Sequence, residues 1–211
     1  ARGRSREADV IVGGLKMAVN LELKPEEKVT RGICDLQKSQ PFFAHLSMSM
    51  KVHRYQPGQG MGTMGVDAKG NMFFDDNFVN QATPPQMQGI ICHECLHAAL
   101  QHMHRVGSRY PKISNLAQDV AVNIMVKKSG MELMEKWKIK GEDGKMYEGA
   151  GVPVDPNTDI SQFSMPMQTG KLEIRIDNVS DKPWEAIYGE MIDQMHKQKK
   201  SPDEVESQLG G

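Results

Sequence analysis

The sequence predicts an α+β fold, because helical and strand patterns lie close together in its central part. Thr83-Pro84-Pro85-Gln86 combines a capping threonine, first-turn prolines and a capping-box glutamine, so it predicts a helix that continues to about Arg105. Apolar and polar residues alternate from His45 to Tyr55, which predicts a half-buried strand. Two shorter strands are predicted on either side of Asp67-Ala68-Lys69-Gly70, since Gly70 can adopt the positive φ of a hairpin turn.

The first forty residues are predicted to be helical. Apolar residues from Val10 to Leu21 recur at helical spacing, and Pro25-Glu26-Glu27 is typical of the first turn of a second helix. Pro41-Phe42-Phe43 then closes this helical region.

The C-terminal half is predicted to contain two helices separated by a long irregular segment. The first helix spans about Ile113 to Lys128 and ends at Gly130, and the second spans Trp184 to about Gln198. Glycine, proline and aspartate are frequent from Gly141 to Lys182, which predicts loop with one short strand near residues 172–176. The tail after Ser201 is predicted to be mobile.

Composition excludes several partner classes. The chain has 211 residues, enough to bury one substantial core. Its 26 basic and 27 acidic residues give a net charge of -1, so there is no electrostatic argument for binding nucleic acid or an anionic membrane surface. No apolar run approaches the roughly 18 residues of a membrane span, and no signal-peptide pattern is present. We therefore expect a cytoplasmic, intracellular protein.

The most informative motif is His93-Glu94-Cys95-Leu96-His97, an HExxH sequence within the predicted central helix. A helix advances about 100° per residue, so the two histidines lie one turn apart on the same face and can bind one metal ion. Glu94 is then next to the metal, where it can accept a proton from a water molecule. The pattern predicts a zinc site with Glu94 as catalytic base.

Nearby cysteines and histidines are predicted not to be ligands. On a continuous helix Cys92 and Cys95 project to other sides than His93, so they are expected to pack as small apolar side chains. His102 projects at about 180° from His93, and His104 lies roughly 10 Å further along the axis. Both are expected to be structural or surface histidines.

The third ligand is expected on the next helix. Asn115, Asp119 and Asn123 recur every four residues and form a polar stripe on an otherwise apolar helix. A buried carboxylate needs a partner, and zinc would supply one. We predict Asp119 as the third metal ligand, with Asn115 and Asn123 orienting the ligands. The alternative is an ion pair of Asp119 with Arg105 or Arg109.

At this point the sequence resembles a known family, the putative metallopeptidase domain of bacterial and phage proteins that often precedes a von Willebrand factor A-like domain. The resemblance runs from about Glu26 to Leu133 and includes the HExxHxxxxHxxR-like spacing and the Asn-x-x-x-Asp-x-x-x-Asn stripe. It departs at Ser114, where an aromatic residue is usual. The resemblance implies a zincin-like α+β fold, in which a small antiparallel or mixed sheet packs on the HExxH helix and a second helix carries a ligand. It also implies zinc on His93, His97 and Asp119.

These observations together predict four consecutive parts of the chain. They are an N-terminal helical extension (1–24), a zincin-like metallopeptidase core (25–135), an irregular insertion (136–183) and a C-terminal helix with a mobile tail (184–211). Segment 141–182 is expected to cover the cleft or bind a protein partner.

The predicted function is zinc-dependent hydrolysis of peptide or protein substrates. An extended substrate is expected to pair with the edge of the sheet formed by residues 61–75, and Tyr110 or Tyr147 is a candidate for stabilising the oxyanion. The alternative is a non-catalytic zinc-binding module with an assembly or regulatory role. The glutamate of HExxH favours the enzyme, because a structural zinc site needs no general base.

Overall fold

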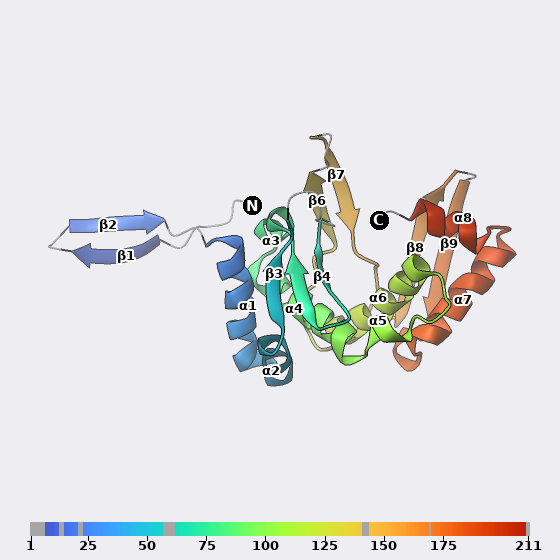
Figure 1. Ribbon diagram of the computed structural model, residues 1–211, viewed down its shortest axis with the longest axis horizontal. Coiled ribbons are helices and arrows are strands. Elements are labelled where there is room, and N and C mark those ends of the chain that lie inside the picture. Colours follow the sequence, from blue (N-terminus) through green and yellow to red (C-terminus); the bar gives the residue numbers. More distant parts are fainter. Residues whose placement is uncertain are drawn as a thin grey trace.

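The computed structural model describes residues 7–12, 15–20, 23–56, 62–140, 144–168 and 170–209. The molecule is elongated, with an N-terminal hairpin at one end and the last helices at the other (Figure 1). Within the described residues the fold is mixed α+β, with helices and several small sheets. The α+β prediction is confirmed at this level. No helix in the described ranges is both long enough and apolar enough to cross a membrane.

The predicted N-terminal helix is wrong over the described residues. β1 (Glu7–Val12) and β2 (Leu15–Asn20) form an antiparallel pair. The β-branched run Val10-Ile11-Val12 favours a strand, which outweighs an apolar spacing that is compatible with a helix. Residues 1–6, 13–14 and 21–22 of that prediction lie outside the described part of the chain.

In the part of the chain that the structure describes, the first lobe contains four helices and two small sheets. Its helices are α1 (Pro25–Ser39), α2 (Pro41–Met48), α3 (Asp76–Gln81) and α4 (Pro84–Ala99). Its strands are β3 (Lys51–Arg54), β4 (Met64–Val66), β5 (Asn71–Phe74), β6 (Lys136–Lys140) and β7 (Met146–Ala150). The order β3-β5-β4 is mixed, because β3 is parallel and β4 antiparallel to β5. This small mixed sheet packs on α4, as predicted.

The strand predicted from His45 to Tyr55 is correct only in its second half. Pro41 opens α2 instead of closing the preceding region, and the helix continues to Met48. The strand that follows, β3, is short and all four of its residues are exposed. The alternation that predicted a half-buried strand therefore spans the end of a helix and the start of an exposed edge strand.

The start of α4 is confirmed and its end is not. The Thr83 backbone N–H donates to Gln86 Oε1 at 3.0 Å, and the Gln86 N–H donates to Thr83 Oγ1 at 3.4 Å, which completes the capping box. The helix ends at Ala99, because Gln101 adopts a left-handed conformation with φ of 54°. A separate short helix, α5 (His102–Arg105), follows. Glutamine has no preference for this conformation, so the sequence carries no signal for the break.

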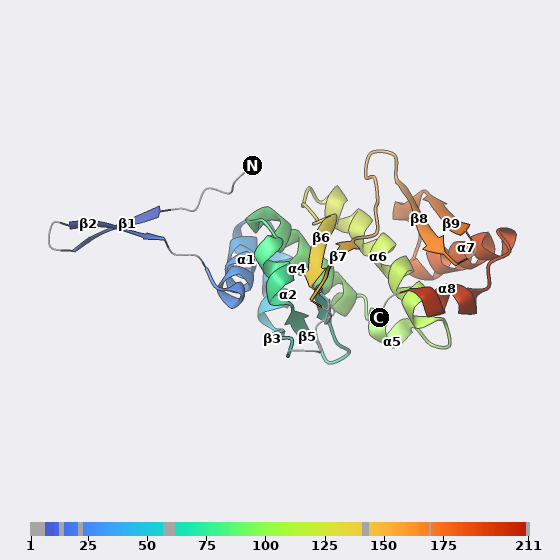
Figure 2. The same cartoon turned by 90° about the horizontal axis from the view of Figure 1, so that it is seen from above.

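Helix α6 (Pro111–Lys128) lies between two hydrophobic cores, and it agrees with the predicted helix. Its residues Val122 and Val126 pack in the core of the first lobe, whereas Ile113, Val120 and Ile124 pack in the core of a second lobe. Both views in Figures 1 and 2 show α6 between α4 and α7. One helix thus joins the two cores.

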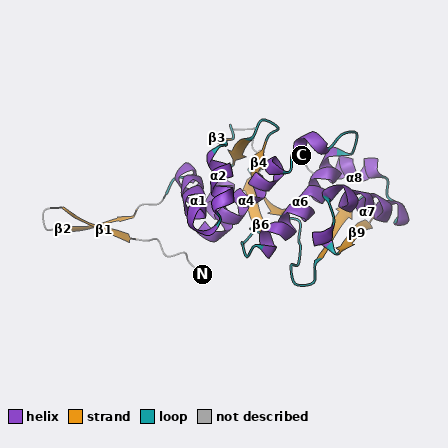
Figure 3. Cartoon of the chain, turned by 90° about the horizontal axis from the view of Figure 1, so that it is seen from below, coloured by secondary structure: helices purple, strands orange, loops and turns teal. Residues whose placement is uncertain are grey.

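The second lobe occupies a region predicted to be largely irregular. It consists of β8 (Ile160–Met167), β9 (Gly170–Asp177), the 3-10 turn η1 (Val179–Asp181), α7 (Trp184–Lys197) and α8 (Pro202–Gln208). Figure 3 shows α7 and α8 at the opposite end from α1 and α2. The prediction of α7 is confirmed. The prediction of an irregular segment with one short strand is wrong for the described residues, and the tail predicted to be mobile forms α8; residues 141–143, 169 and 210–211 lie outside the described part.

Sequence features explain why β9 and α8 form where loop and tail were predicted. Leu172, Ile174 and Ile176 alternate on the buried face of β9, so the predicted short strand is the centre of a longer one. In the tail, Ser201 Oγ accepts a hydrogen bond from the Asp203 N–H at 3.2 Å and caps α8, and Val205 is fully buried. A single buried residue on a short capped helix is a weak sequence signal.

Glutamine side chains in and just after α7 close the outer edge of β9. Gln194 accepts from the Arg175 N–H at 2.9 Å and donates to the Arg175 carbonyl at 2.7 Å. Gln198 makes the same pair of bonds with Glu173, at 2.9 and 2.6 Å. The two amides satisfy the backbone groups that a further strand would otherwise use.

Candidate metal centre

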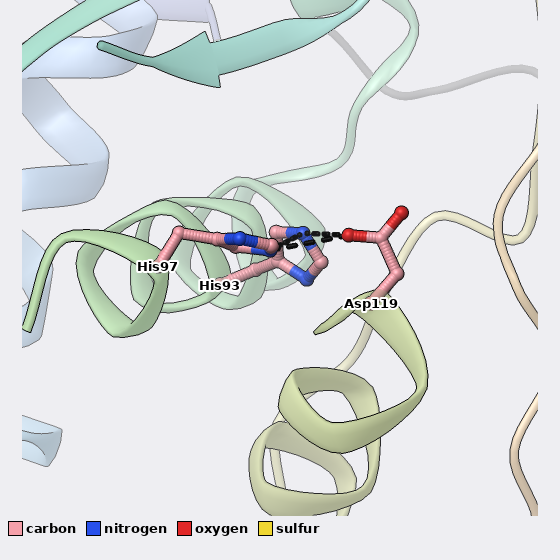
Figure 4. Close-up of side chains that lie close together, drawn as sticks. All are labelled: His93, His97 and Asp119. Carbon is pink, nitrogen blue, oxygen red and sulfur yellow. Dashed lines mark hydrogen bonds and ion pairs between the residues drawn. The ribbon is translucent and has the colours of Figure 1, made fainter. Parts of the chain in front are cut away.

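Three side chains from two helices converge at the boundary between the lobes. His93 and His97 project from α4 and Asp119 from α6, and Figure 4 shows them pointing toward one another. His97 Nε2 lies 3.0 Å from His93 Nε2 and 3.1 Å from Asp119 Oδ1, and His93 Nε2 lies 3.5 Å from the same oxygen. One ligand atom from each of the three residues lies within 4.8 Å of the others. The group could therefore hold a metal ion.

Packing of the first lobe fixes the position of α4. Ile91, Cys92 and Cys95 are fully buried on the sides of the helix away from the histidines. Burial raises the pKa of both thiols to about 12, so they are protonated and pack as apolar groups, as predicted. Gly89 lies against the Glu132 carbonyl, where a Cβ atom would be 1.8 Å from the oxygen. Glycine at this position permits the close approach of α4 to the segment after α6.

The two predicted orienting residues lie next to the converging side chains. Asn123 Oδ1 is 2.8 Å from His93 Nδ1, and Asn123 Nδ2 donates to the Val152 carbonyl at 2.8 Å. Asn115 Nδ2 donates to Asp119 Oδ2 at 3.3 Å. The polar stripe predicted on this helix therefore faces the histidines.

The structure brings a further histidine to the centre. His102 Nδ1 lies 3.1 Å from His97 Nδ1, and only 1% of His102 is exposed. Burial, followed by the neighbouring His97 and Arg105, lowers the pKa of His102 to about 3, so its ring is neutral. The projection that placed His102 away from the site assumed a continuous helix, whereas the left-handed Gln101 turns it back. His104 remains at the surface, with Nε2 3.1 Å from the Ala68 carbonyl.

Charges at the centre favour a bound cation. Burial opposes protonation of His93, but the hydrogen bond and charge of Asp119 together with the charge of Glu94 raise its pKa to about 9. Burial also disfavours the Asp119 carboxylate, but the two histidines hold its pKa below the ordinary value. The metal-free chain therefore keeps a proton on the half-buried His93, so the site stabilises positive charge, which a metal ion would also supply. The donor atoms present thus fit a metal ion.

The alternative partners considered for Asp119 are engaged elsewhere. Arg105 forms an ion pair with Glu185, with Nη2 2.5 Å from the carboxylate. The Arg109 guanidinium lies 5.3 Å from the centre of the Trp184 ring. Asp119 pairs with the histidines instead.

The centre opens into a cleft of about 910 Å³ between the lobes. Glu94 is among its lining residues and is only 6% exposed, and burial raises the pKa of its carboxyl group. β4 forms part of the wall on the first-lobe side, and Phe163 and Met165 of β8 form part of the opposite wall.

The predicted oxyanion candidates do not line this cleft. The Tyr110 hydroxyl donates to Asp203 at 3.0 Å, and Tyr147 is 52% exposed on β7. Tyr55 lines the cleft instead, with its ring stacked on Phe73 and its hydroxyl close to Gly65 of β4. Because Tyr55 follows an exposed edge strand, no sequence pattern indicated it.

A family comparison agrees with this arrangement. The model of a family described as "Putative metallopeptidase domain" matches residues 24–143, which is more than half of the chain. The match includes α4, α6 and all three converging side chains. Comparison with curated proteins and with solved structures finds no match. The family model covers enough of the sequence to assign membership, and the chain belongs to the putative metallopeptidase domain family.

Proposed function

We propose that the protein is a zinc-dependent metallopeptidase with a zincin-like catalytic core. The observation that carries the proposal is the convergence of His93, His97 and Asp119 at the floor of a cleft that Glu94 also lines. Two imidazoles and one carboxylate are a typical set of protein ligands for catalytic zinc, which keeps a further position open. Family membership supports the same class of activity.

Each residue has a distinct role in the proposed reaction. Bound zinc would supply a Lewis acid that polarises the scissile carbonyl and lowers the pKa of water toward neutrality. Glu94 accepts the proton of the attacking water and delivers it to the leaving amine. Its burial supports this role, because a raised carboxyl pKa brings a general base closer to neutral pH. Asn123 and Asn115 orient His93 and Asp119.

The outer edge of β4 is the proposed binding site for an extended substrate. The Asp75 N–H donates to the Thr63 carbonyl at 3.1 Å, and the Asp67 N–H donates to the Asn71 carbonyl at 3.0 Å. Hydrogen-bonded pairs alternate along an antiparallel ladder, so the backbone groups of Met64 and Val66 point away from β5. β4 is an edge strand that lines the cleft, and strand addition there would bring a peptide past Glu94.

The decisive experiment compares two carboxylate-to-amide variants in the same cleft. Glu94→Gln should retain zinc and lose about 10²–10⁴-fold in the rate of cleavage of a mixed peptide library. Glu135→Gln is the matched control, because Glu135 lines the cleft but is exposed and paired with Lys127. Its cleavage rate should stay close to that of wild type.

Metal content provides the second arm of this experiment. Asp119→Ala should lower zinc affinity by at least about 100-fold. Loss of a residue that only hydrogen-bonds to a ligand lowers metal affinity by at most about that factor, so a larger loss is expected for a ligand itself. Unchanged zinc stoichiometry and affinity in Asp119→Ala would remove Asp119 from the ligands. Zinc bound by wild type and by Glu94→Gln, with no cleavage by either, would favour the non-catalytic zinc-binding module.

A further inference from the structure

The two histidines of the candidate metal centre have different partners behind them. Both rings direct Nε2 toward Asp119, and each Nδ1 faces a second polar residue. Behind His93 that residue is Asn123, an ordinary amide acceptor. Behind His97 it is another histidine, His102.

We propose that His102 is a positioning residue that accepts the Nδ1–H of His97 and holds that ring in its metal-binding orientation. This inference rests on the proposed function, since it takes His97 Nε2 to be a metal ligand. It goes further in making metal retention depend on a residue outside the HExxH motif.

The donor and acceptor follow from the geometry. The two Nδ1 atoms are 3.1 Å apart, so one carries the shared proton and the other accepts it. An imidazole that binds metal through Nε2 keeps its proton on Nδ1, so His97 donates and His102 accepts. The rings are nearly perpendicular, at 87°, which suits a bond directed from one ring edge to a nitrogen of the other. His102 is then the tautomer protonated on Nε2.

His102 is fixed from two directions. Gln118 Nε2 donates to its backbone carbonyl at 3.4 Å, and its ring packs against Trp184 at 6.1 Å between centroids. Trp184 is itself 2% exposed and belongs to α7 in the second lobe. A side chain of the second lobe therefore supports the residue behind His97, although residue 184 lies beyond the family match at 24–143.

Two substitutions at position 102 separate hydrogen bonding from packing. His102→Phe keeps a ring against Trp184 but has no acceptor, whereas His102→Asn loses ring volume but places an amide oxygen near the position of Nδ1. We expect His102→Phe to lower zinc affinity about 10–100-fold, measured by chelator competition, and His102→Asn to stay within roughly threefold of wild type. Thermal unfolding of the metal-free variants should rank them in the opposite order, since the packing loss is larger in His102→Asn.

A spectroscopic measurement on the wild type does not depend on any variant folding. In ¹⁵N-labelled, zinc-loaded protein, ring-nitrogen shifts should show His97 protonated at Nδ1 and His102 unprotonated at Nδ1. A proton on His102 Nδ1, or equal zinc affinity of wild type and His102→Phe, would overturn the positioning role while leaving the metallopeptidase proposal intact. A wild-type protein that binds no zinc at this centre would overturn both.

Discussion

The two lobes contribute to the candidate metal centre in different ways. The first lobe carries His93, Glu94 and His97 on α4, and it lies almost wholly within the family match at residues 24–143. The second lobe supplies one wall of the cleft and, through Trp184, the packing behind His102. Among the described helices and strands, only α6, which brings Asp119, belongs to both cores. The converging side chains therefore come from α4 and α6, whereas both lobes shape the cleft around them.

Core truncations test whether the lobes fold as one unit. Ile91→Ala in the first core and Ile187→Ala in the second each delete a fully buried side chain, so each should cost about 2–5 kcal/mol of unfolding free energy. Because α6 is shared, both variants should shift the same denaturant transition. The chain has two tryptophans, Trp137 in the first lobe and Trp184 in the second, so single-tryptophan variants report each lobe by fluorescence. Separate midpoints for the two reporters would show that the lobes unfold independently.

The pH dependence of stability should originate in the first-lobe histidine His93. The pKa of His93 in the metal-free chain is raised from 6.5 to about 9. Its protonated form therefore contributes its full stabilisation of the fold below pH 6.5. This contribution is lost as the pH rises to about 9. Zinc requires the neutral ring, so zinc affinity should rise about tenfold per pH unit in this window, where one proton is displaced.

Melting curves with zinc and with chelator should therefore diverge between pH 6.5 and 9. Asp119→Asn is the control for the metal-free chain, because it removes the charge that raises the His93 pKa. A metal-free wild type whose melting temperature is flat across this window would contradict the assignment.

Substitutions on β8 should change substrate preference without changing metal binding. Phe163 lines the cleft from the second lobe, and we predict that Phe163→Ala raises KM roughly 10-fold for peptides with large apolar side chains. Met167→Ala is the matched control, because Met167 lies on the same strand but is not among the lining residues. Zinc affinity should be the same in both. Loss of zinc in Phe163→Ala would mean that the wall also shapes the metal centre.

The parts that sequence predicted well are those with local chemical signals. The capping box at Thr83 and the four-residue spacing of Asn115, Asp119 and Asn123 gave the two helices and the faces that converge. The structure brings His93, His97 and Asp119 together, while their roles in zinc binding and catalysis stay predictions.

The parts that sequence missed depend on contacts distant along the chain. The second lobe is held by burial against α6, and the strand pattern of β8 is weak because the strand contains Pro166 and polar residues. His102 could be placed only after the left-handed Gln101 was known, because one such residue redirects everything that follows it. Likewise, Tyr55 reaches the cleft across β5, with its ring on Phe73 and its hydroxyl near Gly65 of β4, and such a tertiary contact leaves no periodic pattern in the sequence.

The glutamines beside β9 affect where an extended polypeptide chain can pair with the protein. An open strand edge can pair with an extended polypeptide, so every such edge is also a site for unproductive capture or self-association. Gln194 and Gln198 occupy the outer edge of β9, whereas β4 is an edge strand among the described strands and lines the same cleft as Glu94. The two amide side chains thus make the outer edge of β9 unavailable for pairing with an extended chain, and under the proposed function a substrate would pair at β4 instead.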